Sequence, residues 1–329
     1  MSDYINEIGS QGVQEIPQPS EVIENTPASL PEPLENTPPL VSQSPESLSE
    51  GYAAKIGTDN LPANVSSITQ ANAESAAAKP PPDTVYDGLF VGANGQTLGA
   101  ETPLNQIPSV KPNNGKVATE TVIFVNGINT TKDSQAATLQ KIANQEGLNV
   151  IGIHNATEGM VKDIGQSVKD KLDVGTNPAV DTLANTVYNE IKAGRDVHLL
   201  AHSQGGLITS RALTDVYQRL RAEDGLSKAD AQKMLGKVNV ETFGAAAGHY
   251  PDGPKYVHYI NSNDPVPNLF GLGSKIDKYN PTLDPGKGAV VHHFKQGHWW
   301  SISGTHSFDS VYLPRRVPFE QARRGDFSR

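Results

Sequence analysis

The feature that most constrains this chain is a series of short, unbroken apolar runs that alternate with segments of helical periodicity. Such runs are typical of strands buried on both faces of a parallel sheet. The runs cover residues 121–125, 148–153, 197–201, 238–243, 256–260 and 289–294, and the helical segments cover residues 134–145, 180–193, 207–222 and 228–235. This alternation predicts an α/β fold with a mostly parallel central sheet and helices on both faces.

A β-hairpin is expected just before the first of these runs. Within residues 89–98, Asn94-Gly95 stands between two short segments with β propensity. Asn-Gly between such segments is the strongest short-range hairpin signal, because both residues tolerate positive φ. We expect this hairpin to supply edge strands to the sheet.

The acidic character of the chain belongs to its first 82 residues. They hold 12 of the 24 prolines and 11 acidic against 2 basic residues, which accounts for the whole net charge of −9. Such a composition buries too little apolar area to offset the entropy of ordering. We therefore predict a disordered acidic tail at residues 1–82, acting as a spacer or as a segment that docks to secretion machinery or another protein partner.

An α/β domain is expected at residues 83–314, followed by a basic C-terminal tail at residues 315–329. Five arginines in that tail could contact anionic lipid at a membrane surface, the alternative being a solvated tail. Because residues 83–329 carry 25 acidic and 25 basic groups, we expect no nucleic-acid partner.

Composition also narrows the chemistry and the compartment. The absence of cysteine excludes disulfides, thiolate nucleophiles and cysteine-type zinc sites. No metal site is expected at His292-His293, which lacks further ligands at suitable spacing, and no cofactor is implied. The N-terminus has neither the basic nor the apolar region of a signal peptide, and no stretch reaches about 18 apolar residues. We expect a cytoplasmic protein or one exported by a leaderless route.

A candidate nucleophile follows the apolar run at residues 197–201. Ala201-His202-Ser203-Gln204-Gly205 fits the pattern small-x-Ser-x-Gly, and the residues after it begin a helical pattern. A serine on a tight strand-to-helix turn needs small residues two positions before and after it, because strand and helix approach closely there. The motif predicts Ser203 as a nucleophile, and an ordinary serine helix cap is the alternative.

A carboxylate and a histidine follow in the chain order that this arrangement requires. Asp264 comes directly after the run at residues 256–260, in N-S-N-D-P-V-P, where a turn residue before proline is the alternative interpretation. His306 opens a loop-to-helix junction after the last run and is the expected base, with His298 in Q-G-H-W-W as the alternative. The sequence therefore predicts a catalytic triad of Ser203, Asp264 and His306.

An oxyanion hole is expected from two backbone N–H groups. The first belongs to Gln204 at the start of the helix, where the helix dipole favours negative charge. The second belongs to Ile128, because Gly127 allows the chain to turn sharply after the early strand at residues 121–125. An ordinary Asn-Gly turn is the alternative for this loop.

With these motifs, the chain resembles the lipase and esterase branch of the α/β-hydrolase superfamily over residues 119–313. A-H-S-Q-G-G is similar to its nucleophile elbow, F-V-N-G-I to its oxyanion strand, N-S-N-D-P-V-P to its acid loop and G-T-H-S-F-D-S-V-Y-L to its histidine loop. The resemblance implies hydrolysis of an acyl ester or lipid substrate through an acyl-serine intermediate. It departs from the family pattern at Asn126, where lipases often carry His, and at Ala201, where Gly is commonest.

Two alternatives to ester hydrolysis remain open at this point. The same triad could transfer the acyl group to an acceptor other than water, or the domain could be a hydrolase-shaped scaffold whose tail binds a partner. Residues 160–172 carry a narrow apolar stripe at helical spacing, which predicts either a core-packed helix or a lid over an acyl pocket.

Overall fold

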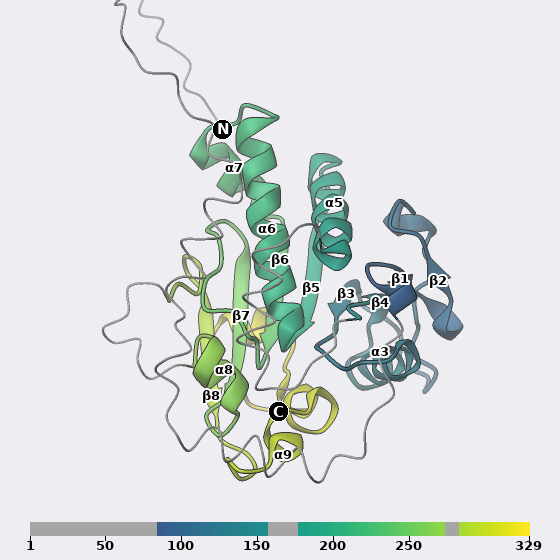
Figure 1. The fold of residues 1–329 in the computed structure, drawn as a ribbon, viewed down its shortest axis with the longest axis vertical. Helices are drawn as coiled ribbons and strands as arrows, with labels where there is room; N and C mark the ends of the chain where they lie inside the picture. Colours follow the sequence, from purple (N-terminus) through teal and green to yellow (C-terminus); the bar gives the residue numbers. More distant parts are fainter. Residues whose placement is uncertain (1–83, 157–176, 274–282) are drawn as a thin grey trace, which may run out of the picture. The chain divides into compact units, whose positions relative to one another are not determined.

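The computed structural model describes residues 84–156, 177–273 and 283–329. These residues form an eight-stranded sheet of order β2-β1-β4-β3-β5-β6-β7-β8 (Figure 1). Its strands are β1 (Phe90–Val91), β2 (Thr97–Leu98), β3 (Thr121–Val125), β4 (Asn149–Ile153), β5 (Val197–His202), β6 (Val238–Phe243), β7 (Lys255–Asn261) and β8 (Val290–Phe294). Strands β3 to β8 pair in parallel, whereas β1 is antiparallel to both of its neighbours. The predicted α/β fold with a mostly parallel sheet is confirmed.

The longer helices occupy the four segments with helical periodicity. They are α3 (Lys132–Glu146), α5 (Pro178–Lys192), α6 (Gln204–Ala222) and α7 (Lys228–Leu235). Three of them begin at a side chain that caps the first turn, namely Thr131 for α3, Asn177 for α5 and Ser227 for α7. Helix α6 starts three residues earlier than its apolar periodicity indicates, because Gly205 and Gly206 contribute no apolar side chain to the pattern.

Shorter helical segments lie before β3 and after β7. They are η2 (Thr84–Tyr86), η3 (Ala93–Gly95), η4 (Leu104–Gln106), α8 (Pro265–Phe270), α9 (Ile302–His306), the π-helix η7 (Phe308–Tyr312), η8 (Leu313–Arg315) and α10 (Phe319–Arg323). Segments of this length are too short to show helical periodicity in the sequence.

The predicted hairpin is present. Phe90 pairs with Leu98 in antiparallel register, and Asn94 and Gly95 both adopt positive φ in the turn between β1 and β2. Of the two hairpin strands, only β2 is at the edge of the sheet, because β1 also pairs with β4. The hairpin therefore extends the parallel sheet on the side of β4.

Alternating side chains of the strands build two separate cores. Ile123, Leu199 and Val240 pack with side chains of α5, α6 and α7 on one face of the sheet. Val122 and Leu200 pack with α3 and with the C-terminal segment on the other face. Successive residues of a strand point to opposite faces, so strands that are apolar throughout require both layers of helices.

The C-terminal segment corrects the expectation of a separate basic tail at residues 315–329. Arg316, Val317, Phe319 and Ala322 are all buried, the last three in the same core as α3. Helix α10 is in contact with β7, whose Val257 and Tyr259 belong to this same core. The five arginines suggested a solvated tail, but the apolar residues between them hold this segment against the domain.

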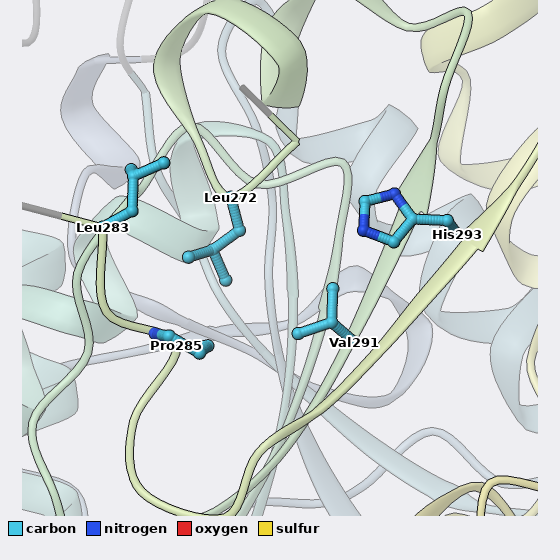
Figure 2. Close-up of a pocket in the computed structure, with 5 residues that line it drawn as sticks. All are labelled: Leu272, Leu283, Pro285, Val291 and His293. Carbon is cyan, nitrogen blue, oxygen red and sulfur yellow. The ribbon is translucent and has the colours of Figure 1, made fainter. Parts of the chain in front are cut away.

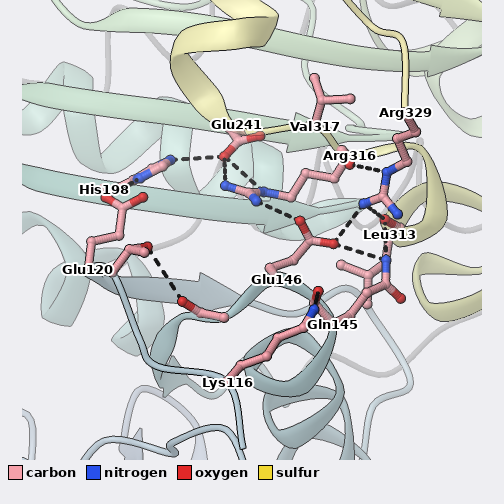
Figure 3. Close-up of polar contacts among 12 residues, drawn as sticks. Lys116, Glu120, Gln145, Glu146, His198, Glu241, Leu313, Arg316, Val317 and Arg329 are labelled. Atoms are coloured by element: carbon pink, nitrogen blue, oxygen red, sulfur yellow. Dashed lines mark hydrogen bonds and ion pairs between the residues drawn. The ribbon is translucent and has the colours of Figure 1, made fainter.

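A buried ionic network joins this C-terminal segment to the sheet (Figure 3). Glu241 on β6 is fully buried and lies 2.7 Å from Nη2 of Arg316. Arg316 also lies 2.8 Å from Glu146 at the end of α3, and Glu146 is 2.8 Å from Arg329. Removing one partner from such a buried pair costs about 3–5 kcal/mol, because the other charge is left without compensation.

His198 on β5 completes the network between two carboxylates. Its Nε2 lies 2.9 Å from Glu241 Oε1 and its Nδ1 lies 3.0 Å from Glu120 Oε2. Burial lowers the pKa of His198, but the hydrogen bonds and negative charges of Glu120 and Glu241 outweigh it, so that its pKa is raised above 6.5. Both ring nitrogens therefore donate, as in the protonated imidazolium.

Two predicted segments lie outside the described residues. These are the tail at residues 1–82 and the apolar stripe at residues 160–172. Within the described parts of the chain, none of the helices has the length and hydropathy needed to span a bilayer.

We predict that His198 makes the stability of the domain depend on pH. Because its pKa is raised on folding, the stabilisation by the protonated ring is complete below pH 6.5 and is lost as the pH rises through the folded-state pKa. The difference in free energy of unfolding between the wild type and His198→Gln should therefore shrink as the pH rises above 6.5 and through the folded-state pKa of His198. Urea denaturation at several pH values measures it, and parallel pH trends in the two proteins would contradict the prediction.

Candidate active site

Ser203 lies on a strained turn between β5 and α6. Its φ of 56° and ψ of −122° fall outside the regions that a residue with a Cβ normally adopts. Hydrogen bonds hold the turn: the Ser203 N–H donates to the Phe243 carbonyl at 3.1 Å, and the Ser203 carbonyl accepts N–H groups from Gly206 and Ala246, each at 3.0 Å. Strain that surrounding bonds maintain in this way is typical of functional sites.

Glycines around Ser203 allow the close approach that this turn requires. A Cβ at Gly205 would overlap the carbonyl oxygen of Val125 on β3, and a Cβ at Gly206 would overlap the side chain of Ala245. A Cβ at Gly127 would lie 2.8 Å from the Cβ of Ser203. The loop after β3, which contains Ile128, is therefore packed directly against the serine.

The three predicted triad residues come together in a continuous line of hydrogen bonds. His306 Nε2 lies 2.8 Å from Ser203 Oγ, and His306 Nδ1 lies 2.6 Å from Asp264 Oδ2. Because a carboxylate only accepts, Nδ1 carries the proton, which leaves Nε2 free to accept from the serine hydroxyl. This is the tautomer in which a histidine can take a proton from serine.

Asp264 is fully buried and both of its oxygens are occupied. Oδ1 accepts the Val266 N–H at the start of α8 at 2.9 Å, and Oδ2 accepts from His306 and from the hydroxyl of Tyr312, the latter at 2.5 Å. Burial and the adjacent charge of Asp264 raise the pKa of Tyr312 well above 10.0, so that it remains a donor. Tyr312 was not singled out in the sequence, although it lies within G-T-H-S-F-D-S-V-Y-L, because that segment drew attention only to His306.

His202 is a second residue whose role the sequence did not indicate, although it lies inside the serine motif. Its Nε2 is 2.9 Å from the carbonyl oxygen of His306, and the two rings lie 4.7 Å apart. Burial and repulsion from the charge of His306 hold the pKa of His202 well below 6.5. The ring is therefore neutral and donates through Nε2 to the backbone carbonyl of His306. This hydrogen bond fixes the position of the His306 backbone.

Two buried asparagines connect the loop after β3 to the helix that follows Ser203. Asn126 Oδ1 accepts the Asn155 N–H at 2.9 Å, and Asn126 Nδ2 donates to the Asn155 carbonyl at 2.8 Å. Asn155 Nδ2 in turn donates to Gln204 Oε1 at 2.9 Å. Gln204 is buried as the first residue of α6, while the half-buried Ile128 packs against Ala246 and Val266. Both expected oxyanion donors thus belong to the immediate surroundings of Ser203.

Asn261 links the acid loop to the histidine loop. At the end of β7, its Nδ2 donates to the carbonyls of Gln296 at 3.0 Å and Thr305 at 2.9 Å. Its Oδ1 accepts the N–H groups of Gln296 and Asn263. The Asn261 side chain therefore connects the loop that carries Asp264 to the segment that carries His306. The only sequence signal for this role was the position of Asn261 in N-S-N-D.

Neither the histidines of β8 and the loop that follows it nor a cavity beside β8 belongs to the triad. His298, the alternative base, stacks on Trp300 with ring centroids 4.5 Å apart. A cavity of about 240 Å³ is lined by Leu272, Leu283, Pro285, Val291 and His293, and none of the triad residues lines it (Figure 2). His292 points to the other face of β8, where it stacks on Phe327. The described residues contain no cluster of three or more His, Asp or Glu side chains able to hold a metal ion.

Comparisons with known proteins leave the family unassigned. No protein-family model and no curated protein matches the chain. Among solved structures it resembles Aspergillus fumigatus lipase B, with 13% identity over 73% of this chain and 65% of that one, at a TM-score of 0.33. It also resembles a Pyrobaculum calidifontis esterase, with 8% identity over 77% of this chain and 84% of that one, at a TM-score of 0.34. A third similar structure is the RedJ thioesterase from the prodiginine biosynthetic pathway of Streptomyces coelicolor, with 13% identity over 81% of this chain and 96% of that one, at a TM-score of 0.30. All three TM-scores lie below 0.5, and such likenesses do not define a function.

We predict that Gly205→Ala destabilises the domain, because the new Cβ overlaps the backbone of β3. Overpacking of this kind costs about 1–3 kcal/mol or more in free energy of unfolding. Gly99→Ala is the matched control, since nothing lies within 4 Å of the added Cβ, and its effect should stay within about 0.5 kcal/mol. Equal urea midpoints for the two variants would contradict the close approach of α6 and β3.

Proposed function

We propose that the chain is a serine hydrolase of the α/β-hydrolase type that cleaves a carboxylic ester through an acyl-serine intermediate. The observation that carries the proposal is the line of hydrogen bonds from Ser203 through His306 to the buried Asp264. It lies at the carboxyl ends of parallel strands, where α/β sheets gather their ligands. The strained backbone of Ser203 further supports a nucleophile, because an ordinary helix cap has an extended backbone.

In the first half of the reaction, Ser203 Oγ attacks the ester carbonyl carbon while His306 Nε2 takes its proton. Asp264 holds the imidazole and stabilises its positive charge. The N–H groups of Gln204 and Ile128 stabilise the negative charge on the carbonyl oxygen. As the tetrahedral intermediate collapses, His306 gives the proton to the leaving alcohol, and the acyl group remains on Ser203.

In the second half, His306 takes a proton from water, whose oxygen attacks the acyl-serine carbonyl. Collapse of the second tetrahedral intermediate releases the carboxylic acid and returns the proton to Ser203 Oγ. The enzyme is regenerated without any change of oxidation state, and these residues alone account for each proton.

The surroundings of Ser203 support an apolar acyl group on the substrate. Ala246, whose N–H binds the Ser203 carbonyl, forms a small apolar cluster with Val266. Ile128, Leu207 and Phe270 pack against this cluster while remaining partly exposed. Ligand sites combine such apolar walls with a few placed polar groups.

Replacing Ser203 by Ala should abolish ester hydrolysis, lowering kcat by about 10⁴-fold or more because no nucleophile remains. Asp264→Asn should lower kcat by about 10⁴-fold, because the amide disfavours the required histidine tautomer. Turnover of p-nitrophenyl butyrate measures both effects, with the exposed Ser310→Ala variant as the hydroxyl control.

A fluorophosphonate probe and a series of ester chain lengths test the same proposal further. The probe should label the wild type and not Ser203→Ala, and an unlabelled but folded wild type would favour a non-catalytic scaffold. Activity that is confined to acetyl esters would contradict the apolar acyl group. A product formed only when an acceptor alcohol or amine is supplied would instead identify an acyltransferase.

We predict that His202 acts on the reaction through the position of His306. His202→Leu removes the donor to the His306 carbonyl and should lower kcat by roughly 10–100-fold with little change in KM. His202→Gln keeps an N–H group of similar reach and should restore most of that loss. If Gln and Leu are equally impaired, the side chain acts through packing alone.

A further inference from the structure

The two tryptophans of the chain form an exposed aromatic pair. Trp299 and Trp300 are the only tryptophans in the sequence, and they are 50% and 55% exposed. Their rings lie 5.9 Å apart, edge to face, and His298 stacks on Trp300. Tryptophan is highly buried on average in proteins, and exposed apolar patches mark interaction sites. We call Trp299, Trp300 and the stacked His298 the tryptophan patch.

The tryptophan patch lies at the carboxyl ends of the parallel strands, as the proposed active site does. It belongs to the loop between β8 and α9, and β8 runs parallel to β7, after which Asp264 follows. Helix α9 begins at Ile302 and ends at His306, and it is in contact with α8, which Asp264 caps. The patch is therefore separated from the proposed base by a single short helix.

The loop that carries the patch is held in place by the residues of the acid loop. Asn263 Nδ2 donates to the Gly297 carbonyl at 2.6 Å, and Asn261 makes hydrogen bonds to both the N–H and the carbonyl of Gln296. The Ser301 N–H donates to the His298 carbonyl at 2.9 Å. A fixed loop loses little conformational entropy on binding, so its exposed rings are ready for a partner.

Basic groups flank the patch. Lys295 is exposed at the start of the loop, and the exposed Arg315 lies 3.3 Å from Gln296 Oε1 with its guanidinium over the ring of Phe294. Among the described residues, the side chains that make hydrogen bonds to the loop belong to Asn261, Asn263 and Arg315, none of which is acidic. Aromatic rings beside cations complement the headgroup region of an anionic bilayer.

We infer that the tryptophan patch inserts into the surface of an anionic lipid bilayer and holds the carboxyl ends of the strands, where Ser203 lies, against the membrane. Two indoles are too small an area for a stable protein interface, which buries roughly 800 Å² on each partner. They suit an interfacial anchor, because an indole has an apolar body and a polar N–H. The biological role of this anchor rests on the proposed function, since membrane binding would bring the active site to lipid esters.

Intrinsic fluorescence tests the inference without any substitution, because both tryptophans belong to the patch. Ser203→Ala protein is titrated with vesicles of phosphatidylcholine containing about 30 mol% phosphatidylglycerol. The emission maximum should shift to the blue, and lipids brominated near the headgroup should quench it. Emission that stays unshifted and unquenched would overturn the inference.

Matched variants assign the binding to this surface. Trp299→Ala/Trp300→Ala should lower the partition coefficient in vesicle co-sedimentation by at least about tenfold. Val117→Ala, which shortens an 87% exposed apolar side chain just before the amino end of β3, should leave it unchanged. Lys295→Gln should lower it about fivefold, whereas Lys255→Gln at the start of β7 should not. Binding that survives the double substitution would overturn the inference.

The two proposals fail separately in these experiments. Hydrolysis of soluble p-nitrophenyl butyrate by the wild type, together with no vesicle binding by Ser203→Ala, overturns the membrane inference and leaves the proposed hydrolase intact. Vesicle binding through the tryptophan patch, together with no fluorophosphonate labelling, supports the anchor and overturns the hydrolase.

Discussion

The backbone of Ser203 is the constraint on which the rest of the site depends. A residue with a Cβ is held there at a φ of 56°, between the end of β5 and the first turn of α6. Such a conformation costs on the order of 1–3 kcal/mol and persists only where its surroundings maintain it. The carbonyl of Phe243, the N–H of Ala246 and the missing side chain of Gly205 provide those surroundings. Strands β3, β5 and β6 therefore all take part in presenting one hydroxyl group.

The second constraint is that His306 must meet two partners that are themselves fixed. Asp264 is held by the first turn of α8 and by Tyr312, and His202 holds the carbonyl of His306. A histidine at the end of a five-residue helix has little stiffness of its own. Its orientation is set by hydrogen bonds at both ring nitrogens and at its backbone, which is the kind of preorganisation that acid–base chemistry requires.

The polar groups of this domain fall into two networks with different tasks. Near the carboxyl ends of the strands, neutral side chains such as Asn126, Asn155 and Asn261 connect loops that carry the site. Within the sheet, Glu241, His198 and Arg316 form a charged network that attaches the C-terminal segment. Neutral amides can orient catalytic groups without adding a net charge to the site. The ionic network instead holds the C-terminal segment on the sheet and makes the stability of the domain depend on pH.

The sequence by itself determined the α/β class, the four longer helices and the chain order of Ser203, Asp264 and His306. It could do so because strands buried on both faces are apolar throughout, and because a serine between strand and helix needs small neighbours. Only the tertiary structure decided that Tyr312 and His202 make hydrogen bonds to Asp264 and His306, that Asn261 joins the loops that carry these two residues, and that residues 315–329 pack onto the sheet. The hydrogen bonds join residues that lie 35 to 104 positions apart in the chain, and the packing of residues 315–329 depends on which side chains become buried. Neither local periodicity nor a short motif carries information about which distant side chains will meet, because that depends on how helices and strands pack.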